Sequence, residues 1–290
     1  MGFRLHRPED VGAAIGLARD FGPEARYLAG GTDLIIQVNR GHRTSSDLIA
    51  LDRLAVLSGI DERPDRVEIG ALTTMKTIEC DARLRGPLGA LPEAARVVGG
   101  HQIRNVATIG GNIANASPAA DLLPVLLALD AEVELVGPEG TRRIPLGRFL
   151  RGPGVTAREP SELIRRVAFG PPPANVATAF IKAGRRRAME ISIVCVAALL
   201  AFDEHGRCRE ARIALGAVGP TAMRATSAEA ILRGGEQSAA AFRAAGAAAA
   251  ADCAPISDVR ASAWYRRRLV AALVPRALAR CRERIVAGSA

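Results

Sequence analysis

Residues 28–34, LAGGTDL, and residues 107–112, ATIGGN, are two double-glycine segments in which the glycine pair follows an apolar stretch. Adjacent glycines have no Cβ atoms, so backbone N–H groups can come close to an anion and surround its oxygens. The hydroxyls of Thr32 and Thr108 add further donors. Two such turns suit a diphosphate. Each segment taken alone is better explained as a plain tight turn, and this alternative stays open.

No standard nucleotide-binding fingerprint accompanies these segments. The chain has neither a G-x-G-x-x-G segment after a strand nor a glycine-rich loop that ends in Gly-Lys-Ser or Gly-Lys-Thr. These absences argue against a Rossmann NAD domain and against a P-loop NTPase.

A carboxylate follows the second glycine segment at short range. Asp121 lies in SPAADLLP, residues 117–124, directly before an apolar stretch that is predicted to be helical. A carboxylate in this place can accept hydrogen bonds from two hydroxyls of a sugar or polyol. The alternative is that Asp121 only caps the following helix.

The hydropathy pattern predicts a mixed chain of helices and strands with one clear internal boundary. The segment Gly170-Pro171-Pro172-Pro173 separates two regions, because three successive prolines cannot continue a helix or a central strand. A helix is predicted over residues 8–21, with Pro8 in its first turn and Gly22 as its end. Apolar spacing predicts strands over 26–29, 47–51, 67–69, 131–136, 191–201 and 209–217, and helices over 74–81, 91–98, 124–129 and 239–251.

Length and composition fit an ordinary globular chain of about two domains. The chain has 290 residues, of which 49% are hydrophobic and 24% charged, and this excludes wholesale disorder. Its net charge of +9 first points to nucleic acid. However, all basic residues except Lys76 and Lys182 are arginines, as expected from a GC-biased genome, and aromatic residues make up only 3%. We therefore expect no nucleic-acid partner, although charge alone leaves that class open.

Cysteine and histidine usage predicts neither a metal site nor a disulfide framework. The cysteines stand apart without a C-x-x-C pair, and the four histidines are equally dispersed. Scattered thiols of this kind are typical of reduced, cytoplasmic proteins. The longest apolar run, residues 191–202, is far shorter than a membrane span. We therefore expect a cytoplasmic protein without metal ligands, targeting segment or membrane span.

The glycine segments belong to a longer set of motifs that carries a resemblance. AGGTDL at 29–34 and TIGGN with SPAADLLP at 108–124 are accompanied by Phe180-x-Lys182-x-x-Arg185-Arg186, GAVGPTAMRA at 216–225, DVRAS at 258–262 and YRR at 265–267. Together these motifs resemble the FAD-binding medium subunit of molybdenum hydroxylases. That family includes the flavoprotein subunits of xanthine dehydrogenase, aerobic carbon monoxide dehydrogenase and nicotinate dehydrogenase. The resemblance covers nearly the whole chain.

The resemblance implies a fold and a domain division. It implies an α+β chain in which a vanillyl-alcohol-oxidase-like, PCMH-type FAD-binding domain of two lobes occupies residues 1–172. The lobes are expected at about 1–55 and 56–172. A small α+β C-terminal domain of the CO dehydrogenase flavoprotein type is expected over residues 173–290. FAD is expected between the lobes, bound non-covalently, with its pyrophosphate at the glycine segments.

The resemblance also implies which residues bind FAD, and it implies no catalytic side chain. The first cradle is expected to comprise Tyr27, Leu28, Ala29, Gly30, Gly31, Thr32, Asp33 and Leu34, and the second Thr108, Ile109, Gly110, Gly111 and Asn112. Polar flavin contacts are matched by Asn115 and Asp121. Positions that approach the flavin from other segments are matched by Val98, Ile164 and Lys182. A lysine near the flavin would steady its reduced, anionic ring.

The expected partners carry the cofactors for which this chain has no ligands. The chain lacks the cysteine sets of [2Fe–2S] clusters and is too short for a molybdopterin subunit. The resemblance therefore places those cofactors on a small iron–sulfur subunit and a large molybdopterin subunit of a heterotrimer. The expected activity is that of an oxidoreductase subunit, which accepts electrons from the partner clusters and passes them to an external acceptor such as NAD or a quinone. Two alternatives stay open: a standalone flavin reductase or oxidase of the same fold, and a flavin-free assembly or interaction protein.

Overall fold

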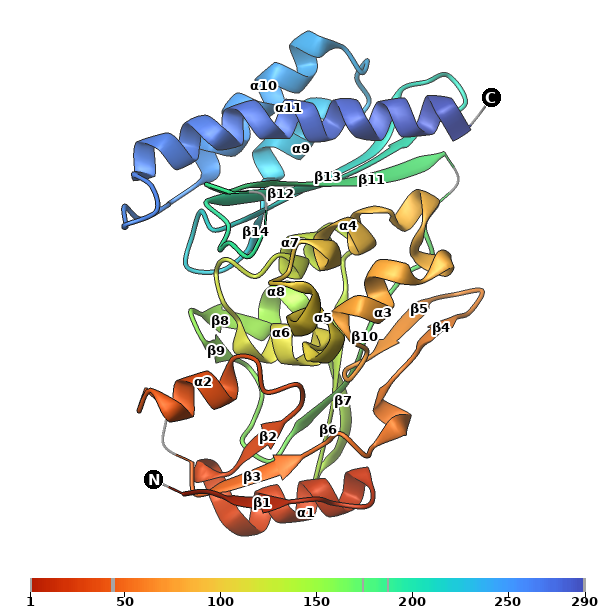
Figure 1. The fold of residues 1–290 in the computed structure, drawn as a ribbon. Helices are drawn as coiled ribbons and strands as arrows, with labels where there is room; N and C mark the ends of the chain where they lie inside the picture. Colours follow the sequence, from red (N-terminus) through yellow and green to blue (C-terminus); the bar gives the residue numbers. More distant parts are fainter. Residues whose placement is uncertain (1, 43–44, 174, 187, 289–290) are drawn as a thin grey trace.

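The computed structural model describes residues 2–42, 45–173, 175–186 and 188–288. Figure 1 shows the three larger sheets arranged one above another, in the order in which the chain forms them. Helices pack between the middle and C-terminal sheets and over the outer face of the last one (Figure 1). Helix and strand are mixed along the whole chain, as the α+β prediction requires.

The N-terminal sheet consists of parallel strands in the order β1 (Arg4–His6), β3 (Asp47–Ala50) and β2 (Arg26–Leu28). Helix α1 (Val11–Phe21) connects β1 to β2, and the short helices η1 (Gly22–Glu24) and α2 (Leu34–Asn39) flank β2. The predicted start of the first helix at Pro8 is wrong. Asp10 is the N-cap, and its side chain accepts a hydrogen bond of 2.7 Å from the backbone N–H of Ala13. Gly22, with a φ of 69°, ends the helix as predicted.

The middle sheet is antiparallel, with strands in the order β4 (Ile60–Glu62), β5 (Val67–Gly70), β10 (Leu163–Phe169), β6 (Glu132–Gly137) and β7 (Gly140–Pro145). One face covers a hydrophobic core that it shares with short helices. These are α3 (Met75–Cys80), α4 (Ala90–Arg96), α5 (His101–Val106), α6 (Ile109–Asn115), α7 (Leu122–Ala128) and α8 (Leu146–Phe149). Minor elements are η2 (Ala55–Leu57), η3 (Ala82–Leu84), η4 (Gly86–Leu88) and the hairpin of β8 (Leu150–Gly152) and β9 (Val155–Thr156).

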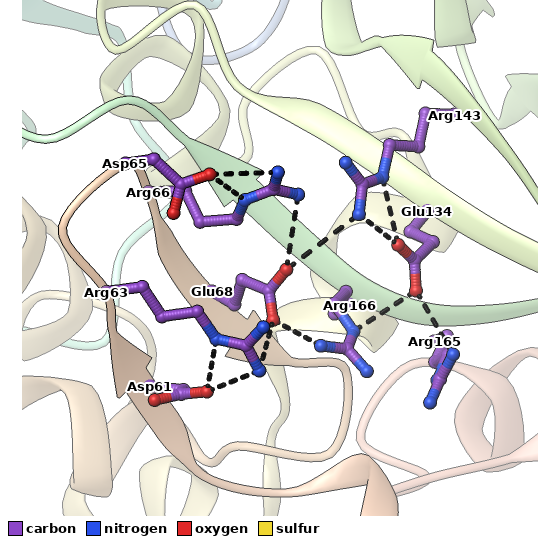
Figure 2. A network of polar contacts seen from close by, with 9 residues as sticks. All are labelled: Asp61, Arg63, Asp65, Arg66, Glu68, Glu134, Arg143, Arg165 and Arg166. Atoms are coloured by element: carbon purple, nitrogen blue, oxygen red, sulfur yellow. Dashed lines mark hydrogen bonds and ion pairs between the residues drawn. The ribbon is translucent and has the colours of Figure 1, made fainter.

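The other face of the middle sheet carries ion pairs around two buried carboxylates (Figure 2). Glu68 and Glu134 are each only 4% exposed, because arginine side chains cover them. A β-bulge between Ile164 and Arg166 turns two consecutive arginines toward one carboxylate. Arg165 Nη1 lies 3.5 Å and Arg166 Nε 3.2 Å from Glu134 Oε1. The remaining arginines of this network are Arg63, Arg66 and Arg143.

Replacing Glu134 with glutamine should lower the free energy of unfolding by about 1–3 kcal/mol, because it removes the shared counter-charge of three arginines without changing side-chain size. The arginines are partly exposed, so water offsets part of the loss. Urea unfolding of the purified chain measures the effect. Glu139→Gln, in the exposed turn between β6 and β7, is the matched control and should change stability by less than about 0.5 kcal/mol. Equal stability of the two variants would contradict the prediction.

The C-terminal sheet is antiparallel, in the order β11 (Val176–Ala183), β12 (Val194–Phe202), β13 (Cys208–Gly216) and β14 (Met223–Arg224). Helices α9 (Thr226–Leu232) and α11 (Ala263–Gly288) cover one face, and α10 (Ala239–Asp252) packs on both helices. Helices α4 and α7 cover the opposite face. Every residue of β12 is therefore buried, which explains its unbroken apolar run. The strands predicted over 191–201 and 209–217 are confirmed with small shifts of their ends.

Polar contacts join the C-terminal sheet to helix α4. The Glu93 carboxylate accepts a hydrogen bond of 2.9 Å from the backbone N–H of Phe180 and pairs with Arg284 of α11. Nearby, the Thr178 hydroxyl donates to the carbonyl of Pro87 at 2.8 Å. The middle and C-terminal layers are thus held together by more than apolar contact.

Candidate functional site

A cavity of about 560 Å³ lies between the N-terminal sheet and the helices of the middle layer. This volume is typical of sites for small molecules and cofactors. Its walls come from the segment between β2 and α2, from α5 and α6 with their connections, from β10 and the β8–β9 hairpin, and from the loop before β12. The cavity is therefore built by segments far apart in the sequence.

Most of the sequence-predicted site residues line this cavity. They are Tyr27, Ala29, Gly30, Gly31, Thr32, Asp33, Leu34, Val98, Thr108, Gly110, Gly111, Asn112, Asn115, Asp121 and Ile164. The structure places the other three elsewhere. Leu28 and Ile109 do not line the cavity, and Ile109 is fully buried in the core. Lys182 does not line the cavity but forms an ion pair with Asp121, which does.

The first glycine segment offers unused backbone donors. No acceptor is found, within the described part of the chain, for the N–H groups of residues 30–34. A Cβ on Gly30 would lie 1.8 Å from the carbonyl oxygen of Val106, so only glycine allows this approach between the two segments. Gly31 has a φ of 71°, which also favours glycine. This segment has the donors that an anion requires.

The second glycine segment is not a turn, which corrects the sequence prediction. It is the first turn of helix α6, where Thr108 is the N-cap and its hydroxyl accepts a hydrogen bond of 3.1 Å from the N–H of Gly111. The N–H groups of Ile109 and Gly110 donate to the carbonyls of Thr73 and Ala71, at 3.0 and 2.8 Å. These donors are therefore already used by the fold.

Asn112 of the second segment also lines the cavity. Its Oδ1 atom is buried and has no hydrogen-bond partner within the described residues. A buried amide oxygen without a donor costs free energy, and a ligand that donates to it would remove that cost. In the same wall, the Gln37 amide donates to Asn115 Oδ1 at 3.2 Å and so connects α2 to α6.

Asp121 is held in the cavity wall by two residues of the C-terminal layer. It is 6% exposed; Lys182 Nζ lies 2.7 Å from one carboxylate oxygen, and the Ser192 hydroxyl donates to the other at 2.6 Å. Its side chain makes no capping hydrogen bond to α7, so the capping alternative is wrong. Burial raises the pKa of Asp121, while Lys182 and Ser192 oppose that rise. Lys182 Nζ also donates to the carbonyl of Val97 at 3.2 Å, directly before the lining residue Val98.

Another part of the wall combines an aromatic ring with a cation. The Tyr27 hydroxyl donates to the carbonyl of Ser161 at 2.9 Å, and burial raises the pKa of Tyr27 to about 12. The phenol is therefore neutral at physiological pH. The guanidinium carbon of Arg158 lies 5.8 Å from the centre of the Tyr27 ring.

Sequence reasoning missed many lining residues, most of them in segments without a recognisable motif. Gly99 and Gly100 form a further glycine pair, which is visible in the sequence and could have been recognised as part of the site. The position of residues 189–191 depends instead on how β11 and β12 fold. The full set missed is Arg26, Gln37, Leu51, Ala71, Leu72, Met75, Gly99, Gly100, Ile103, Ala107, Ala114, Ser117, Ala119, Ala120, Gly154, Thr156, Arg158, Leu163, Met189, Glu190 and Ile191.

The described residues give no sign of a metal centre or of a membrane-spanning helix. They contain no group of three or more histidine, cysteine or acidic side chains arranged to hold a metal ion. None of the described helices is both long and apolar enough to cross a membrane.

Comparison with known proteins gives matches along nearly the whole chain. The family model of the FAD binding domain in molybdopterin dehydrogenase matches residues 1–172, and that of the CO dehydrogenase flavoprotein C-terminal domain matches residues 179–281. The xanthine dehydrogenase FAD-binding subunit of Escherichia coli O157:H7 is 36% identical over 267 residues, which is 91% of either chain. The carbon monoxide dehydrogenase medium chain of Afipia carboxidovorans is 33% identical, and the match covers 97% of each chain.

A solved structure agrees with these sequence matches. One chain of carbon monoxide dehydrogenase from Hydrogenophaga pseudoflava superposes with a TM-score of 0.94 at 33% identity, and the match covers 98% of each chain. The protein therefore belongs to the family of FAD-binding medium subunits of molybdenum hydroxylases, which confirms the resemblance carried by its glycine segments and tail motifs.

Proposed function

We propose that this chain binds FAD non-covalently in the cavity and serves as the electron-transfer subunit of a molybdenum hydroxylase complex. Membership in the family supports the proposal, since the relatives are FAD-binding subunits and medium chains of dehydrogenases. In this proposal, a small subunit carries the [2Fe–2S] clusters and a large subunit carries molybdopterin. The electrons leave to an external acceptor, which is NAD, a quinone or another carrier.

The observation that carries the proposal is the complementary chemistry of the cavity wall. The free N–H groups of residues 30–34 suit the pyrophosphate, and the unpartnered Oδ1 of Asn112 needs a donor that a polyol or flavin ring can provide. Asp121 offers carboxylate acceptors in the same wall. We assign FAD contact to the predicted residues that line the cavity, and a supporting role to Leu28, Ile109 and Lys182.

The chain's residues bind and orient the cofactor and do not act on the organic substrate. FAD, when bound, supplies one- and two-electron chemistry that no side chain here offers. Lys182 and Ser192 hold the Asp121 carboxylate in one orientation. The neutral Tyr27 phenol donates to the carbonyl of Ser161, which fixes the ring in the wall beside the Arg158 guanidinium. The protein therefore contributes placement and electrostatics.

The domain division and the cellular location belong to the same proposal. We infer domains at residues 1–172, with lobes at about 1–55 and 56–172, and at residues 173–290. Separate sheets on either side of the proline segment support this division. A cytoplasmic location is supported by the cysteines, since those described are free thiols and all except Cys80 are buried.

The purified chain should be yellow, with about one FAD per chain released by acid. The absorbance spectrum shows the flavin, and chromatography of the released chromophore identifies it as FAD. A colourless chain that also fails to take up added FAD would overturn the proposal.

A further inference from the structure

A second cavity, of about 580 Å³, lies where the middle sheet meets the C-terminal layer. Its lining comes from strands β6, β7 and β10 and the residues before β5, from the end of α7 and the start of α8, and from Arg224 of β14. Among the described residues, none lines both this cavity and the cavity assigned to FAD, here called the cofactor cavity. The volume lies in the range of sites for small organic molecules, so a ligand other than the cofactor fits here.

The second cavity takes part of its lining from the face of the middle sheet that carries the ion pairs (Figure 2). On this face, Ala168 of β10 lies between Glu68 of β5 and Glu132 of β6. The short side chain of Ala168 leaves space beside two longer ones. Another part of the lining is apolar and consists of Leu127, Leu146 and Phe169, which belong to the buried core. The cavity therefore combines charged side chains with an apolar wall, as sites for organic ligands do.

Arginines that line the second cavity are held in place by carboxylates. Arg224 forms two hydrogen bonds with the buried Glu229, at 2.6 and 2.9 Å. Figure 2 shows Arg66 and Arg143 paired with carboxylates of the ion-pair network. Arg143 uses its Nε and Nη2 atoms in these pairs, and its Nη1 has no acceptor among the described residues. The cavity wall thus presents fixed guanidinium groups, one of them with a free N–H edge.

Two further charged side chains of the second cavity have no partner. Arg148 of α8 is exposed and Glu132 of β6 is half-buried, and neither side chain forms a hydrogen bond or ion pair with any residue that the structure describes. They line the same cavity without pairing with each other. Four arginines and three carboxylates line the cavity in all, which leaves an excess of positive charge. A ligand that suits it carries an anionic group and hydroxyl donors.

We propose that the second cavity binds a nucleoside monophosphate. The phosphate is assigned to Arg148 and to the free Nη1 of Arg143, because guanidinium groups bind phosphate oxygens through paired N–H donors. The ribose hydroxyls are assigned to the Glu132 carboxylate, since acidic residues accept hydrogen bonds from ribose in dinucleotide sites. The base is assigned to the apolar wall, where its ring is removed from water. The inference does not depend on FAD binding, because the two cavities have separate linings.

The test is calorimetric titration of the full chain with AMP. Arg148→Gln and Glu132→Gln should each raise the dissociation constant of AMP at least about tenfold, because each removes a charged hydrogen-bonding partner. The matched controls are Arg151→Gln and Glu139→Gln, which make the same changes at exposed residues outside both cavities and should bind AMP as wild type does. All titrations are repeated with Gly111→Val, which adds a side chain inside the cofactor cavity and should leave this AMP site intact.

Ribose 5-phosphate, which lacks the base, and adenosine, which lacks the phosphate, should each bind at least about tenfold more weakly than AMP. Ribose 5-phosphate that binds as tightly as AMP would overturn the assignment of a nucleotide. So would AMP binding that is unchanged in Arg148→Gln, or that falls equally in Arg151→Gln, which would indicate general attraction of anions to a basic chain. AMP binding that is lost in Gly111→Val but kept in Arg148→Gln would place AMP in the cofactor cavity and refute the second site.

Discussion

Replacing Gly111 with valine should abolish FAD retention while the fold survives. Gly111 lines the cavity from helix α6, and a Cβ at this position would meet only the Thr108 hydroxyl, at 3.0 Å. Valine is no less favourable than glycine within a helix in free energy, so the main effect of the added carbon atoms is to fill space in the cavity. We expect the dissociation constant of FAD to rise by about two orders of magnitude or more, which corresponds to about 2.7 kcal/mol. Flavin content after purification and titration of the apoprotein measure the effect.

Gly16→Val is the matched control for this prediction. Gly16 also lies within a helix, and a Cβ there meets nothing within 4 Å. This variant should bind FAD normally. Gly31→Val should also prevent binding, but it is a poorer test because Gly31 has a φ of 71° and its Cβ would press on Ile35 and Leu28. Normal flavin content in Gly111→Val would refute the cradle assignment.

Replacing Lys182 with methionine should destabilise the apoprotein by about 3 kcal/mol, because it leaves the buried Asp121 carboxylate without its counter-charge. FAD affinity should fall as well, since Asp121 would lose its fixed orientation in the cavity wall. The effect depends on pH. Burial already raises the pKa of Asp121, and loss of Lys182 raises it further. A carboxyl group whose pKa is higher in the folded state stabilises the fold at low pH, and this contribution is lost as the pH rises through the folded-state pKa.

The stability deficit of Lys182→Met should therefore be smaller near pH 5 than near pH 8, as urea unfolding at about these two pH values would show. The double variant Asp121→Asn with Lys182→Met removes both charges and should recover much of the stability. Lys76→Met is the natural control, because Lys76 is the other lysine of the chain and its side chain is 38% exposed. Equal stability of the two single variants at both pH values would rule out a structural role for the ion pair.

The two glycine segments show how far local sequence can predict this site. Their presence predicted an anion-binding wall, and both segments do line one cavity. Their conformations were less predictable. Gly30 is required by the carbonyl of Val106, and Gly110 by Ala71, whose Cβ would lie 2.6 Å from a Cβ at Gly110. Such contacts join residues far apart in the chain, so no local pattern indicates them. Helix α6 begins after Thr108 because the Thr108 hydroxyl caps it. This cap stabilises a helix where a glycine pair alone would favour a turn.

The contacts of the charged residues were even harder to predict from the sequence. The ion pair of Asp121 and Lys182 spans 61 residues and forms only because α7, which Asp121 precedes, packs against the sheet that contains β11. Lys182 was expected to approach the flavin, and its rarity in an arginine-rich chain was the only local signal. On the middle sheet, the bulge at Arg165 places two neighbouring arginines on one face, which strict strand alternation does not predict.

The complete burial of β12 has a consequence for how the protein is made. The two faces of this strand are covered by α7, which precedes it in the chain, and by α11 (Ala263–Gly288), which follows it. Helices α9 and α11 share one face of the sheet, so that face is not fully covered until α11 has been synthesised. Lys182 and Ser192, which hold the Asp121 wall, lie on β11 and next to β12. The wall of the cavity around Asp121 therefore depends on a sheet that is fully packed only once α11 is in place.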